Sequence, residues 1–174
     1  MESKKQQLGQ IICGFSGVGK TTLGKKYQNV AEIGQSLYRF IFTDPNAYTM
    51  DRELRKNIKE GKIPNPEWPM NYINKIQELR QEYDLVLVFT DPTLMEYFEK
   101  LKIPFWIALP DKSRKEEFLN NFRKRGQDEN FIIRADREWD RRIEQFMKRK
   151  EKKILLKKGE YLEDALIEQG FILK

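Results

Sequence analysis

The chain contains the stretch Gly14-Phe15-Ser16-Gly17-Val18-Gly19-Lys20-Thr21, followed by Thr22. This stretch matches the pattern G-x-x-x-x-G-K-[ST] at every fixed position. Glycines adopt positive φ and let the backbone approach closely, so successive N–H groups can surround a phosphate. In this pattern Lys20 reaches the β- and γ-phosphates, and Thr21 places its hydroxyl on Mg²⁺. We therefore predict that residues 14–22 bind a nucleoside triphosphate together with Mg²⁺.

Outward from this stretch, short apolar runs alternate with amphipathic ones. Residues 84–89 are apolar on both faces, which is typical of a buried strand in a parallel sheet. We predict strands at 10–15, 30–33, 84–89, 104–109 and 154–156, and helices at 19–28, 65–79, 92–100, 111–125, 132–146 and 162–169. This order predicts an α/β fold, a three-layer α/β/α sandwich with a five-stranded parallel sheet. A glycine-rich turn is the alternative for 14–22, but a strand before it and a helix after it favour the phosphate site.

Two helix starts are predicted from capping signals. Asn65 followed by Pro66 is typical of a helix start, and Ser113 with Glu116 has the spacing of a capping box. We therefore expect helices to begin near residues 65 and 111.

Length and composition limit the class of protein. The 174 residues suit one domain, and the net charge of +6 favours phosphate-bearing partners. The chain has no histidine, which excludes histidine acid–base catalysis and histidine metal ligands. Its one cysteine, Cys13, excludes an internal disulfide. The polar segment 1–10 and the short apolar run after it fit neither a signal peptide nor a membrane span, so we expect a cytoplasmic protein without a membrane partner.

Candidate acceptor residues lie between the second and third predicted strands. We assign about 34–72 to an acceptor-binding insertion, irregular up to residue 65 apart from a short charged helix. Glu32 or Asp44 is the candidate base for a hydroxyl proton. Candidates for substrate contact are Ser36, Tyr38, Trp68, Asn71 and Tyr72. Trp68 and Tyr72 can stack on a nucleobase, although their spacing of four also suits packing in a helix core.

Metal and lid residues complete the expected site. Asp91 follows strand 84–89 at the carboxyl edge, where such sheets bind ligands, and is the candidate partner of Thr21 for Mg²⁺. Capping of the next helix is an alternative role that can coexist with metal binding. Residues 112–140 are expected to form a small helical lid, as in small kinases. Its candidates for stabilising a transferring phosphoryl group are Arg114, Arg123 and Arg125, and the alternative is favourable charge near a helix C-terminus.

Four passages resemble phage-encoded P-loop kinases related to the 5-hydroxymethyluracil DNA kinases. They are 14–22, 32–38, the string Asn65-Pro66-Glu67-Trp68-Pro69-Met70-Asn71-Tyr72-Ile73, and 123–126 with Trp139 beyond. The resemblance implies a P-loop kinase fold, ATP and Mg²⁺ as cosubstrates, and phosphorylation of a pyrimidine hydroxymethyl group in DNA. Such relatives usually carry an aspartate and then two serines where Glu32, Gln35 and Ser36 stand here, so the substrate can differ.

Two other functions fit the same residues. A nucleoside or deoxynucleoside monophosphate kinase would share the architecture but needs arginines for the acceptor phosphate. Arg39, Arg52 and Arg55 lie in the insertion, and nothing in the sequence assigns them this role. An ATP-binding protein without transfer is the second alternative. A GTPase is excluded because Asn74-Lys75-Ile76-Gln77 lacks the closing aspartate of N-K-x-D.

Overall fold

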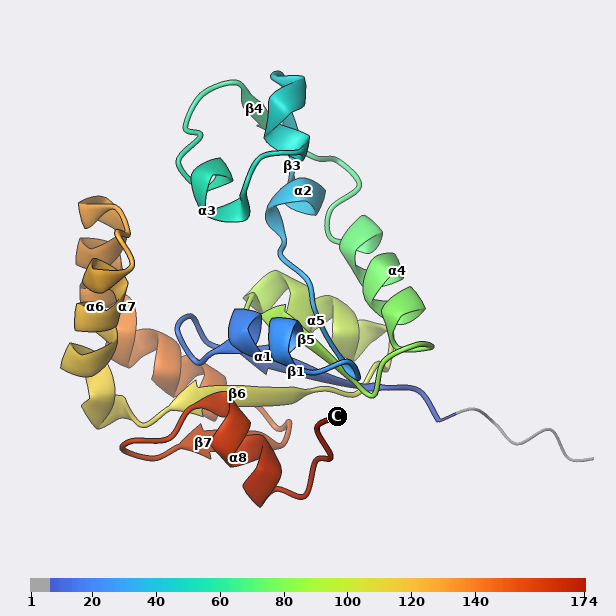
Figure 1. Ribbon diagram of the computed structural model, residues 1–174, viewed down its shortest axis with the longest axis vertical. Helices are drawn as coiled ribbons and strands as arrows, with labels where there is room; N and C mark the ends of the chain where they lie inside the picture. The colour runs from blue at the N-terminus through green and yellow to red at the C-terminus, as the bar shows by residue number, and fades with distance from the viewer. Residues whose placement is uncertain (1–6) are drawn as a thin grey trace, which may run out of the picture.

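The computed structural model describes residues 7–174, whose main feature is one parallel sheet (Figure 1). Its strands follow the order β2-β5-β1-β6-β7. They are β1 (Gln10–Gly14), β2 (Val30–Glu32), β5 (Leu85–Phe89), β6 (Trp106–Pro110) and β7 (Lys153–Leu156). The predicted α/β fold with a five-stranded parallel sheet is confirmed, and each strand lies within two residues of its predicted limits. The predicted polar N-terminal segment includes residues 1–6, which lie outside the described residues.

Helices lie on both faces of the sheet. The main ones are α1 (Lys20–Lys26), α4 (Met70–Leu79), α5 (Pro92–Lys100), α6 (Lys115–Lys124), α7 (Glu129–Met147) and α8 (Leu162–Glu168). Helices α1 and α8 are neighbours on the face nearer the viewer in Figure 1, joined by the ion pair Lys26–Glu163 at 2.6 Å, and α5 lies behind the sheet. Both faces of the central strands are therefore covered, which explains why Ile11, Ile12 and Val88 are fully buried.

One predicted helix start is wrong, and one predicted capping box is absent from the described residues. Helix α4 begins at Met70, because Pro69 has no N–H and its ring disfavours the α conformation at Trp68. The capping box at Ser113 does not form. Instead, Asp111 accepts a hydrogen bond from Ser113 N at 2.9 Å and begins the 3-10 helix η2 (Lys112–Arg114), and no side chain caps α6.

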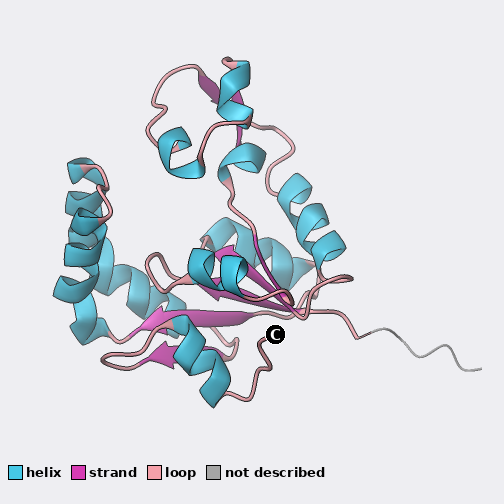
Figure 2. Cartoon of the chain, viewed as in Figure 1, coloured by secondary structure: helices cyan, strands magenta, loops and turns pink. Residues whose placement is uncertain are grey.

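The insertion is more ordered than the sequence predicts. It holds α2 (Ser36–Arg39), β3 (Phe40–Phe42), the 3-10 helix η1 (Pro45–Tyr48), α3 (Arg52–Arg55) and β4 (Lys62–Pro64). Strands β3 and β4 pair antiparallel, and Figure 2 shows this pair apart from the main sheet. The short charged helix that the sequence predicts around residues 51–60 corresponds to α3. The remaining stretch is not irregular as predicted, because three-residue strands and single-turn helices are too short to show a period in the sequence.

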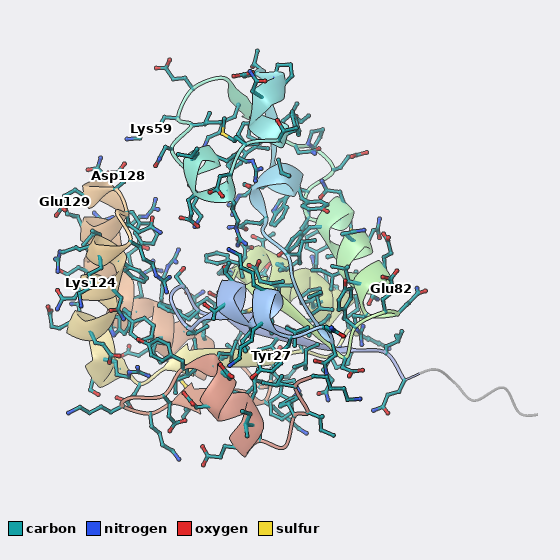
Figure 3. All side chains as sticks on the ribbon, in the orientation of Figure 1. Tyr27, Lys59, Glu82, Lys124, Asp128 and Glu129 are labelled. Carbon is teal, nitrogen blue, oxygen red and sulfur yellow. The ribbon has the colours of Figure 1, made fainter. Side chains whose placement is uncertain are left out.

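The insertion and the α6–α7 hairpin project from the same side of the sheet (Figure 1). The predicted lid corresponds to η2, α6 and the first part of α7. An ion pair of 3.0 Å between Lys59 Nζ and Asp128 Oδ2 joins the two projections, and Figure 3 shows these residues beside each other. The base of the hairpin is fixed by Trp139, which is fully buried and packs edge-on against Phe15. Within residues 7–174, no helix combines the length and apolar character needed to cross a membrane.

Candidate functional site

The carboxyl ends of three neighbouring strands form one edge of the sheet. Gly14 of β1 is in register with Phe89 of β5, and Glu32 of β2 is in register with Leu87. The segments that follow these strands therefore begin side by side. This edge brings the loop of residues 14–21 together with Glu32 and Asp91.

The 14–21 loop has a backbone that only glycine adopts readily. Gly17 and Gly19 have φ values of 86° and 103°. A Cβ on Gly17 would lie 2.9 Å from a ring carbon of Phe122, so α6 packs closely against the loop. Val18 is fully buried, and its carbonyl accepts a hydrogen bond of 2.9 Å from Leu162 N. Contacts with α6 and with the first residue of α8 therefore hold the loop in this conformation.

The donors of this loop are open. Among the described residues, no acceptor is bonded to the backbone N–H of Ser16, Gly17 or Gly19. No side chain of this part of the chain caps the start of α1 either. Unpaired N–H groups that converge on one point make an anion-binding concavity. Phosphate binding by residues 14–22 stays a prediction.

Lys20 lies folded back across the loop. Its Nζ donates to the carbonyl oxygens of Gly14 at 2.6 Å and Phe15 at 3.1 Å. Burial lowers the pKa of the Lys20 ammonium to about 8; the Glu32 carboxylate opposes this shift, and the Arg52 guanidinium adds to it. A neighbouring polyanion would stabilise the charged form, so the site favours a phosphate-bearing ligand.

Glu32 has one carboxylate oxygen without a hydrogen-bond partner, at the end of β2. Its side chain is only 9% exposed, and its Oε2 accepts a hydrogen bond of 2.6 Å from Arg52 Nη1. Its Oε1 is buried and has no hydrogen-bond partner among the described residues. A buried acceptor without a partner is costly, so a ligand that donates a hydrogen bond to it is favoured. Glu32 and Asp44 both stay candidates for the base, and of the two Glu32 has the carboxylate oxygen without a partner.

Asp91 serves the alternative role that the sequence allowed. Its Oδ1 accepts from Leu94 N at 2.9 Å and caps α5, and its Oδ2 pairs with Arg39 Nη1 at 3.2 Å. Each carboxylate oxygen keeps a second lone pair, so a hydrated cation can still approach. Thr21 is exposed on the first turn of α1. In residues 7–174, no three His, Cys, Asp or Glu side chains gather as a metal site.

Two predicted substrate contacts are corrected by the structure, and one candidate base caps a short helix. Asp44 is exposed and caps η1 by accepting from Asn46 N at 2.9 Å. Tyr72 is fully buried and its hydroxyl donates to Ile33 O at 2.6 Å. Asn71 donates to Tyr38 O at 2.8 Å and accepts from Tyr72 N, which joins α2 to α4. Tyr72 and Asn71 are structural residues because their polar atoms are already bonded.

The remaining acceptor candidates are partly accessible. Trp68 is half-buried, with its ring against Tyr72 and the Arg39 guanidinium 5.5 Å from its centre. Tyr38 is half-buried, and Ser36 Oγ accepts a long hydrogen bond of 3.4 Å from Arg55. These positions stay candidates for substrate contact.

Two of the lid arginines are exposed. Arg123 and Arg125 lie at the C-terminal end of α6, and within the described residues no hydrogen bond or ion pair joins them to the 14–21 loop. Their catalytic role stays a prediction. Arg114 is instead buried, and donates to the carbonyls of Lys157 and Glu160 at 2.8 and 2.7 Å. It is a structural residue beneath α6.

Sequence reasoning missed Arg39 and Arg52. Both pair with carboxylates at the sheet edge, Arg39 with Asp91 and Arg52 with Glu32. Arg52 lies close to the backbone of Gly34, where a Cβ would stand 2.8 Å from its Nε.

Two comparisons of the sequence with known proteins gave no match. No model of a known protein family matches the sequence, and no curated protein matches it. The resemblance to phage-encoded P-loop kinases therefore stays a prediction, and the function rests on the geometry of the site.

Proposed function

We propose that this protein is an ATP-dependent kinase that transfers a γ-phosphoryl group to a hydroxyl group held beside Glu32. One observation carries the proposal: open loop donors and Lys20 share a sheet edge with a buried carboxylate oxygen that has no partner. The loop donors and Lys20 suit the binding of a triphosphate. The carboxylate oxygen of Glu32 suits a hydroxyl group that must lose its proton.

The proposed transfer is an in-line displacement. The acceptor oxygen attacks the γ-phosphorus, and the bond from that phosphorus to the β–γ bridging oxygen breaks. The electron pair of the broken bond stays on the ADP oxygen, and the hydroxyl proton passes to Oε1 of Glu32. Lys20 turns from the carbonyls of Gly14 and Phe15 to the phosphate oxygens and balances their charge.

The residues fit ATP with Mg²⁺. Mg²⁺ usually keeps several waters and takes only one or two protein ligands, so the site needs no cluster of three acids. The Thr21 hydroxyl would hold the ion directly, and Asp91 would hold its water shell. When bound, the ion neutralises charge on the β- and γ-phosphate oxygens.

For the acceptor we propose a pyrimidine hydroxymethyl group, as in 5-hydroxymethyluracil within phage DNA in the cytoplasm of a bacterial host. This part of the proposal comes from the resemblance and from the half-buried ring of Trp68, on which a base can stack. A monophosphate kinase is the second candidate, because Arg39 and Arg52 lie at the acceptor edge.

The test is transfer of label from γ-labelled ATP with Mg²⁺ to two sets of acceptors: DNA that contains 5-hydroxymethyluracil, and pyrimidine mononucleotides. Label in the DNA supports the DNA kinase, and label only in a mononucleotide supports the second candidate. Lys20→Ala should abolish transfer, whereas Lys25→Ala, which removes an exposed lysine from the same helix, should not. ATP binding without label in any acceptor would contradict this kinase proposal.

A further inference from the structure

The insertion contains one buried arginine that donates through all three of its nitrogens. Arg55 is 8% exposed, and its Nε and Nη2 donate to the carbonyls of Ala47 and Met50 at 2.7 and 2.9 Å. Its Nη1 reaches Ser36 Oγ at 3.4 Å. Arg55 is therefore buried within the insertion and holds it together.

Arg39 and Arg52 differ from Arg55 in both exposure and bonding. Their side chains are 40% and 34% exposed. Each pairs with its carboxylate through Nη1 alone, and within residues 7–174 neither Nε nor Nη2 of either arginine has an acceptor. A guanidinium has five N–H donors in a planar fork that matches phosphate. Both arginines therefore keep unused donors.

Both arginines are held in place at the acceptor edge. Glu32 ends β2 and Asp91 follows β5, so the two pairs dock the insertion onto neighbouring strands. Arg52 lies against Gly34, and Arg39 lies over the ring of Trp68. Fixed guanidinium groups lose less side-chain entropy when they bind an anion than mobile ones do.

We propose that Arg39 and Arg52 form a second anion subsite, which binds a phosphate that the acceptor already carries. The phosphate is the monoester of a free nucleotide or the diester of a nucleic-acid strand. Each guanidinium bridges its carboxylate on one side and the phosphate on the other, because its donors point along more than one edge. The inference rests on the proposed function only in naming the bound molecule as the acceptor.

The test measures binding without transfer, by calorimetry at low ionic strength. The protein is the Lys20→Ala variant, so that phosphate binding at the 14–21 loop is weakened. The probes are thymidine, thymidine 5′-monophosphate and an oligothymidylate. We expect at least one phosphate-bearing probe to bind about ten-fold or more tightly than thymidine, as charge-assisted hydrogen bonds to arginine predict. Tighter binding of the monophosphate alone would identify the acceptor as a free nucleotide. Tighter binding of the oligonucleotide alone would identify it as a nucleic-acid strand.

Added substitutions locate the subsite. Arg39→Ala and Arg52→Ala should each reduce the affinity ratio between the phosphate-bearing probe and thymidine to about two-fold or less. Arg134→Ala removes the same charge from an exposed position on α7 and should leave the preference unchanged. If an alanine variant fails to unfold cooperatively on heating, Arg39→Lys and Arg52→Lys replace it, because lysine keeps the positive charge but lacks the planar fork of N–H donors.

The subsite would be overturned if no phosphate-bearing probe binds more tightly than thymidine, or if tighter binding of such a probe survives both arginine substitutions. A preference that disappears with them, in a protein that labels no acceptor, would leave the subsite standing and the kinase proposal wrong.

Discussion

The 14–21 loop and the 34–72 insertion build the two halves of the candidate site in different ways. The loop uses backbone N–H groups and one lysine from contiguous residues. The insertion uses side chains that meet only after folding: Arg52 pairs with Glu32 across 20 positions, and Arg39 pairs with Asp91 across 52. A backbone site is fixed by local φ values, whereas a side-chain site depends on how distant elements dock. Substitutions should therefore affect catalysis and ligand affinity differently in the two regions.

The largest effect is expected at Glu32, where the insertion meets the sheet. Glu32→Gln keeps an oxygen for Arg52 but cannot accept the hydroxyl proton. We expect the transfer rate to fall by about 10²–10⁴-fold, the usual contribution of a general base. Well below pH 8, where Lys20 is charged, the dissociation constant for ATP should change by about two-fold or less, because the loop donors are intact. Single-turnover transfer and ATP titration measure the two quantities separately.

Asp44→Asn is the matched control for Glu32→Gln. Asp44 is the other carboxylate that the sequence offered as a base, and the structure places it on the surface as a cap. Its substitution should leave the transfer rate nearly unchanged. A larger loss at Asp44 than at Glu32 would contradict the assignment of the base.

Added bulk in the loop should lower the free energy of unfolding. Gly17→Ala places a Cβ at φ 86° and 2.9 Å from Phe122, so strain and a clash act together. We expect the free energy of unfolding to fall by about 1–3 kcal/mol, with weaker ATP binding. Gly159→Ala has a similar φ of 82° but no atom within 4 Å of its Cβ, so chemical denaturation should show a smaller loss. Equal losses in the two variants would show that contact with α6 does not matter.

The comparison also explains what the sequence could reveal. The sheet and the loop were predictable because buried strands and the G-x-x-x-x-G-K-[ST] pattern carry their signal in adjacent residues. The β3–β4 pair was not, because its strands are three residues long and one ends at Pro64. The roles of Arg39 and Arg52 could not be predicted, because their carboxylate partners are distant in sequence and meet them only in the folded protein. Asp44 could not be separated from Glu32 as a base because a local cap and a catalytic carboxylate look alike in sequence.

The pH dependence of ATP binding should come from the loop. The pKa of Lys20 is about 8 in the ligand-free protein, below its usual value of 10.5, so the ammonium loses its proton as pH rises through 8. Below that pH the lysine is charged and its contribution to binding is complete. Above it, the dissociation constant for ATP should rise by up to about ten-fold per pH unit. Lys20→Arg stays charged throughout, so a rise that persists in this variant would assign the titration to another group.

The smallest effect is expected where the two projections touch. Lys59 and Asp128 form an ion pair of 3.0 Å, but their side chains are 71% and 38% exposed. Solvent screens such pairs, so Lys59→Ala should change the free energy of unfolding by less than about 1 kcal/mol. Its effect should appear instead as faster amide hydrogen exchange at the start of α7, because the α6–α7 hairpin loses its contact with the insertion. Lys157→Ala removes the similarly exposed pair with Glu168, away from both projections, and should leave exchange there unchanged. Equal exchange in the two variants would mean that the hairpin is held by its base at Trp139 alone. A lid movement that brings Arg123 and Arg125 to the loop would then not require the Lys59–Asp128 contact to break.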